Sequence, residues 1–154
     1  MKTKMMIGLL SLFLCGLMAS VSFAAPWQGW RGSGNWGMGT QYQRMYNPAT
    51  VETVAGEILT IEKGIPGQGM SDGIHLQLKT AQETIAVHLG PEWFIERLDM
   101  KFAIGETIEV KGSRVTYEGK PAIIAAEIKK GDDSLELRND AGVPVWAGRG
   151  ARRR

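Results

Sequence analysis

The chain has very little of what exported enzymes and metalloproteins rely on. Its 154 residues include one cysteine and two histidines. The cysteine, Cys15, lies in a segment that we expect to be removed. The mature chain is therefore predicted to have no disulfide, no thiolate metal ligand and no covalently attached haem. The sequence also lacks a nucleophile elbow, a phosphate-binding loop and a His-Glu metalloprotease pattern.

The carboxylates do not indicate an acid-base or cation-binding site either. Asp132 and Asp133 follow Gly131, which is typical of a turn. Glu92 and Glu96 lie one turn apart on a predicted helix, which is typical of a solvated face. We therefore expect a protein that is not an enzyme.

The amino terminus predicts export. Lys2 and Lys4 precede an apolar run over residues 5–18, and small residues follow. This layout is typical of a secretory signal peptide over residues 1–24, cleaved after Ala24. The run is shorter than the ~20 residues that a bilayer span needs, so the mature chain should have no transmembrane segment. An uncleaved anchor is the alternative. The expected location is the periplasm.

Charge argues against a nucleic-acid partner. The whole chain has 18 basic and 16 acidic residues, and removal of Lys2 and Lys4 leaves 16 of each, a net charge of 16 − 16 = 0. Between residues 47 and 148 there are ten basic and sixteen acidic residues, a net charge of 10 − 16 = −6. Binding phosphates requires a basic groove. The arginines after residue 148 are a solvated terminus or, alternatively, a contact for an acidic surface or anionic lipid.

The order of apolar patterns predicts a mainly β fold. Strands are expected over residues 51–62, 74–79, 84–89, 107–117 and 122–129, with a short helix that begins at Pro91 and uses Trp93 as a plug. This is the plan of a small five-stranded OB-fold-like barrel over residues 47–131, with its helix between strands three and four. Gly56 is expected to mark a bulge, and the apolar parity switches at Gly112-Ser113, which requires another. Residues 132–154 form a carboxyl-terminal extension, with a short sixth strand near Leu135, a docked segment at 143–146 and a basic tail.

Residues 25–46 are rich in glycine, tryptophan and glutamine and show no periodicity. This composition predicts a flexible linker whose deletion leaves the fold intact. In that interpretation the segment is a disordered spacer, and Trp27, Trp30 and Trp36 have no binding role. The alternative is that they anchor a partner or the barrel itself.

The two histidines are the best candidates for a binding site. A tight turn at Ala81-Gln82 and the buried parity of both flanking strands pair His75 with His88, about 5 Å apart at Cβ on the non-core face. Such a pair can chelate a divalent transition metal or respond to pH between 5 and 8, and it also occurs without metal. Gln77 shares this face. Arg114 follows the predicted kink and points into the binding face or to solvent.

Three motifs carry a resemblance to a known family. They are HLGP at 88–91, VKGSR at 110–114 and PVW at 144–146, within a similarity that covers residues 47–148. The chain resembles the exported OB-like domain of the magnetosome proteins MamS and MamX, and more loosely periplasmic OB-fold stress-tolerance proteins. The resemblance implies a link to iron handling and crystal maturation. MamX types also carry haem motifs, which this chain lacks.

These patterns together predict an exported, non-enzymatic OB-fold binding module that engages an envelope protein partner or a small ligand. One alternative is a metal-handling accessory that uses His75 and His88, and a second is an envelope stress-tolerance protein. No cofactor other than such a metal is implied. The sequence leaves the oligomeric state open.

Overall fold

One sheet dominates the computed structural model, which describes residues 34–147. Its strands confirm the mainly β prediction, and the short helix α1 (Glu92–Ile95) lies between the third and fourth as expected. Two short 3₁₀ helices, η1 (Gln43–Met45) and η2 (Pro48–Thr50), precede the sheet. The strands of the described residues are β1 (Val51–Gly64), β2 (Gly73–Thr80), β3 (Thr84–Pro91), β4 (Thr107–Tyr117), β5 (Lys120–Lys130) and β6 (Asp133–Glu136).

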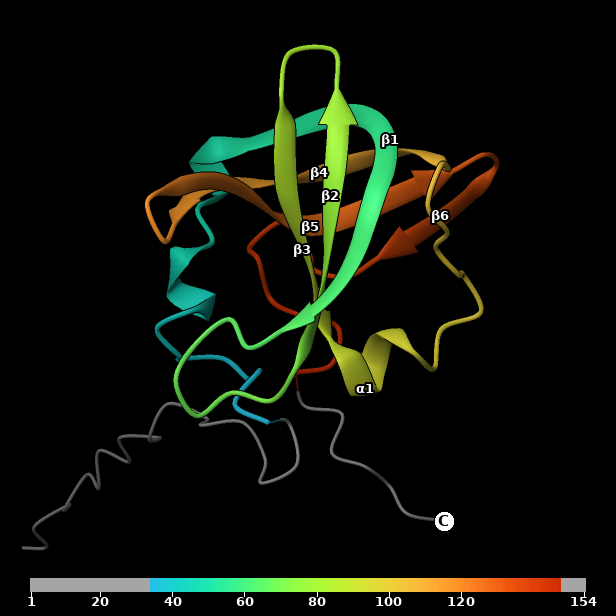
Figure 1. The fold of residues 1–154 in the computed structure, drawn as a ribbon. Helices are drawn as coiled ribbons and strands as arrows, with labels where there is room; N and C mark the ends of the chain where they lie inside the picture. The colour runs from blue at the N-terminus through green and yellow to red at the C-terminus, as the bar shows by residue number, and fades with distance from the viewer. Residues whose placement is uncertain (1–33, 148–154) are drawn as a thin grey trace, which may run out of the picture.

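The sheet turns back on itself. The strand order is β3-β2-β1-β4-β5-β6, and β3 also pairs with β5. That last pairing is parallel, whereas the other neighbours are antiparallel. It closes a ring of hydrogen bonds through β1, β2, β3, β5 and β4. Figure 1 shows the β2–β3 turn at one end of this ring and α1 at the other.

Alternating apolar residues explain both the strands and their register. In β2 and β3, Leu76, Leu78, Ile85 and Val87 are each at most 1% exposed and point into the core. Because the turn between the strands is tight and both apolar faces must point inward, only one register satisfies them. The observed pairs, which include Leu76 with Val87 and Leu78 with Ile85, confirm that prediction.

The bulges are only partly where the sequence places them. The irregularity between β4 and β5 falls between Lys111 and Gly112, next to the predicted parity switch. The prediction for Gly56 is wrong. Gly56 pairs regularly with both neighbouring strands, and the β1 irregularity lies between Ile58 and Thr60. Gly56 is needed for another reason, since a Cβ there would collide with the backbone of Lys79.

The prediction of a flexible linker is wrong for residues 34–46. Trp36 is 2% exposed and its Nε1 donates a hydrogen bond to the carbonyl oxygen of Ser71 at 3.0 Å. Asn35 Nδ2 donates to Gly69 O at 2.6 Å, and Ser71 N donates to Gly34 O at 2.9 Å. Trp36 therefore anchors this segment to the β1–β2 loop, which was the alternative interpretation for this residue.

The carboxyl-terminal segment packs on the same core, as expected for residues 143–146. Trp146 is 2% exposed, and its Nε1 donates to the carbonyl oxygen of Trp36 at 2.9 Å. Its ring also contacts Phe94, with centroids 5.2 Å apart. In α1, Ile95 is the buried residue, while Trp93 is partly buried and packs against the core. Pro91 caps the helix rather than beginning it.

Candidate functional site

The two histidines meet in the β2–β3 hairpin, as the register predicts. His75 pairs with His88, and their rings stack with centroids 4.1 Å apart and planes 8° apart. The ring of Tyr42 lies nearly parallel to that of His88, and a 3.0 Å hydrogen bond joins its hydroxyl to His88 Nδ1. The rings of Tyr117 and His88 meet nearly perpendicular to each other, with centroids 4.8 Å apart. Because of these neighbours, His88 is only 1% exposed.

This burial determines the charge state of the cluster. It lowers the pKa of His88 to about 3, with smaller contributions from the charges of His75 and Arg138. Burial also lowers the pKa of His75 and raises that of Tyr42. The group is therefore neutral near pH 7. With this pKa, His88 stays neutral in the folded protein between pH 5 and 8.

The geometry of the pair does not fit the predicted metal site. Two imidazoles chelate one ion when their lone pairs, which lie in the ring planes, converge on a point. Parallel stacked rings direct those lone pairs side by side, and Tyr42 already occupies His88 Nδ1. Within residues 34–147, no three His, Cys, Asp or Glu side chains are grouped so that they could hold an ion. A firm site needs three or four ligands.

A cleft of about 520 Å³ lies beside this cluster. Tyr42 and Tyr117, which contact His88, are part of its wall. The hydroxyl of Tyr117 donates to the carbonyl oxygen of Pro66 at 2.9 Å, which ties the β1–β2 loop to the end of β4. The described residues that line the cleft are neutral except for one carboxylate: Asn35, Thr40, Gln41, Tyr42, Met45, Pro66, Gly67, Gln68, Met70, Tyr117 and Glu118.

The other predicted site residues lie away from this cleft. Gln77 is half-buried on the same side of β2 as His75 and pairs with Ala86. Arg114 donates from Nε to Glu52 at 2.8 Å and forms an ion pair with Glu83.

Arg114 therefore joins β4 to β1 and to the start of β3, and neither it nor Gln77 lines the cleft. Trp36 is buried in the core and is not available to a partner. Trp27 and Trp30 lie outside the described residues.

Sequence reasoning missed the tyrosines that enclose His88. Tyr42 lies in a stretch without periodicity, so no pattern marks it as buried. Tyr117 ends a predicted strand and looks like any other strand aromatic. The signal that could have found them is the polar His88 inside an otherwise apolar strand, because a buried histidine requires a hydrogen-bonding partner from elsewhere in the chain.

Residues 50–135 match the model of the MamS/MamX magnetosome protein family. The chain belongs to this family. The matched span includes His75, His88 and Tyr117, and it leaves out residues 34–46 and Arg138. One wall of the cleft therefore comes from outside the matched span. No curated protein matches the chain.

None of the helices within residues 34–147 is long and apolar enough to cross a bilayer.

Proposed function

We propose that this chain is an exported, non-catalytic binding module that holds a segment of an envelope protein in the cleft beside the histidine cluster. We also infer that the ring of strands is an OB-fold-like barrel, because the order β1-β2-β3-β5-β4 with a helix after β3 is the plan of that fold. Family membership favours a role associated with magnetosomes.

The position of the cleft is the observation that carries the proposal. OB-folds bind their ligands over strands two and three and between the loops that follow strands one and four. The cleft lies between the corresponding segments here, the β1–β2 loop and the β4–β5 turn. The amino-terminal segment adds a third wall, held by the hydrogen bonds of Asn35 and Trp36.

The lining favours a polypeptide over a phosphate-bearing ligand. Among the described residues that line the cleft, none is basic, and Glu118 is acidic. Phosphate groups need cationic partners, so a nucleic acid is not favoured. Amide side chains such as Gln41 and Gln68 can pair with a peptide backbone, and tyrosine and methionine are enriched where proteins meet. The lining offers both.

Site-specific photocrosslinking in the native envelope tests this proposal. A photoreactive phenylalanine replaces Gln68 in the cleft, and in a matched control it replaces Gln82, which is also exposed and lies in the β2–β3 turn. We expect one discrete crosslinked protein from position 68 that is absent from position 82. A bulky Thr40→Trp substitution across the cleft should abolish it. Equal crosslinking at both positions, or no effect of Thr40→Trp, would contradict the proposal.

A further inference from the structure

Arg138 brings a positive charge into the interior and has no anionic partner within the described part of the chain. It is 2% exposed, and no carboxylate within residues 34–147 forms an ion pair with it. Nη1 donates to the carbonyl oxygen of Leu89 at 3.0 Å and also to that of Ala125. Nε and Nη2 have no hydrogen-bond partner among the residues that the structure describes. A buried cation with free donors is strongly destabilising unless something satisfies them.

The free donors share one edge of the guanidinium plane. The N–H groups on Nε and Nη2 point in the same direction and match the two oxygens of a carboxylate. The face of the plane is already used, because Cζ lies 4.9 Å from the centroid of the Trp146 ring. The edge that binds carboxylates in a bidentate manner is therefore buried and has no partner among the described residues.

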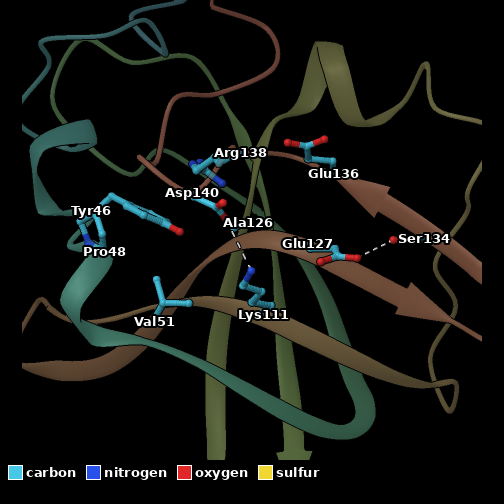
Figure 2. A pocket seen from close by; sticks show the side chains of 10 residues that line it. All are labelled: Tyr46, Pro48, Val51, Lys111, Ala126, Glu127, Ser134, Glu136, Arg138 and Asp140. Carbon is cyan, nitrogen blue, oxygen red and sulfur yellow. Dashed lines mark hydrogen bonds and ion pairs between the residues drawn. The ribbon is translucent and has the colours of Figure 1, made fainter.

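A second cavity, of about 560 Å³, adjoins this side chain. We call it the Arg138 pocket. Tyr46, Lys111 and Asp140 also line it, and Figure 2 shows Tyr46 and Asp140 on the same side as Arg138. Lys111 and Asp140 pair with each other at 3.5 Å. None of the described residues that line the Arg138 pocket also lines the cleft, so the two sites are separate.

The other side of the Arg138 pocket is acidic. Figure 2 shows Glu127 and Glu136 across the pocket from Tyr46, and the hydroxyl of Ser134 donates to Glu127 at 2.7 Å. An inorganic anion such as phosphate would face these carboxylates and be repelled by them. A ligand that carries both a carboxylate and an ammonium group meets a group of opposite charge for each of them.

We propose that the Arg138 pocket binds a small zwitterionic ligand of the α-amino-acid class, its carboxylate on the Nε–Nη2 edge of Arg138 and its ammonium group toward Glu127 and Glu136. The volume is in the range of small-molecule sites. Both nitrogens of the edge are buried in this structure, so binding requires the adjoining wall to open. Tyr46, 8% exposed and part of that wall, is the side chain that we expect to move.

The test begins with thermal unfolding of the mature chain in the presence of each common amino acid, sodium acetate or inorganic phosphate. We expect at least one amino acid to raise Tm in a saturable manner, and acetate and phosphate to leave it unchanged. Calorimetry then gives Kd for the amino acid that binds. Glu127→Gln combined with Glu136→Gln should raise Kd about tenfold or more, since it removes the partners of the ammonium group. The matched control, Glu109→Gln, lies on β4 outside the pocket and should leave Kd unchanged.

Arg138→Lys tests the contact with the carboxylate of the ligand. Lysine keeps the positive charge but lacks the two parallel N–H donors of the guanidinium edge, so Kd should again rise about tenfold or more. If circular dichroism shows that this variant does not fold, the glutamate variants decide alone. The proposal is wrong if no amino acid raises Tm, if acetate binds as tightly as the amino acid, or if the glutamate double variant retains the wild-type Kd.

Discussion

The buried histidine should make stability depend on pH well above the range in which carboxylates titrate. His88 is 1% exposed, its pKa in the folded protein is about 3, and in an unfolded chain it would be about 6.5. Between these values the unfolded state binds a proton that the folded state does not. The stability that His88 contributes is therefore fully present above pH 6.5 and is lost as the pH falls toward 3. Between pH 8 and pH 5 the loss from this residue is about 2 kcal/mol.

The groups packed around His88 do not reverse the predicted loss of stability as the pH falls. The pKa of His75 is also lowered by burial, so it adds to the loss. Tyr42 and Tyr117 have raised pKa values and stay neutral throughout this range. The pKa of Glu106 is lowered mainly by a backbone hydrogen bond from Ala103. Carboxylates of this kind change the stability mainly below pH 4.5. Ending the comparison at pH 5 therefore keeps the contribution of such carboxylates small.

Urea denaturation of residues 25–154 at pH 8 and pH 5 measures the effect. The comparison variant is His88→Asn, whose amide can replace Nδ1 as the partner of Tyr42 and cannot be protonated in this range. Asparagine is smaller and lowers stability at both pH values, so the informative quantity is the difference between them. We expect the wild type to lose about 2 kcal/mol or more and the variant to lose clearly less. An equal loss in both proteins would refute the assignment of the pH dependence to His88.

Three further predictions follow from packing and from the stacked pair. Gly56→Ala should lower stability by about 2–3 kcal/mol in urea denaturation because its Cβ would collide with backbone, whereas Gly64→Ala on the same strand, with its nearest neighbouring atoms at 3.7 Å, should change it by less than about 0.5 kcal/mol. Trp36→Ala should cost about 3–5 kcal/mol, and a chain that lacks residues before 47 should be destabilised rather than intact; a wild-type Tm for both would show that the segment does not support the core. Adding Cu²⁺ or Zn²⁺ should shift Tm equally in the wild type and in His75→Ala, because the lone pairs of the stacked rings do not point at one ion. A shift that depends on His75 would instead support metal binding by the histidine pair.

Local patterns were sufficient for the strands and for the pairing of the histidines. Residues such as Leu76 and Leu78 alternate with polar ones, and a tight turn leaves one register that keeps both apolar faces inward. The same reasoning failed for Gly56, because a glycine in a strand can mark either a bulge or a close approach of another backbone. Which of these applies depends on the neighbouring strand, and the sequence of β1 does not contain that information.

The surroundings of the site could not be predicted, because they depend on contacts between residues far apart in the chain. Tyr42 and His88 are 46 residues apart, and Trp36 and Trp146 are 110 apart. Isolated aromatic residues in a glycine-rich stretch have no period that would show which face they bury. Arg138 follows Leu137 at the end of a short strand, where an arginine is usually exposed, and nothing in that pattern indicates that it is buried.

The most direct test of the proposed function is hydrogen exchange of residues 25–154 with and without the protein that crosslinks at Gln68. If the cleft holds a segment of that protein, added protection should be confined to residues 35–45, to the β1–β2 loop at 66–70 and to the turn at 117–118. The β2–β3 turn around Gln82 should exchange at the same rate in both samples. Protection at that turn or along β6, with the cleft unchanged, would contradict the account.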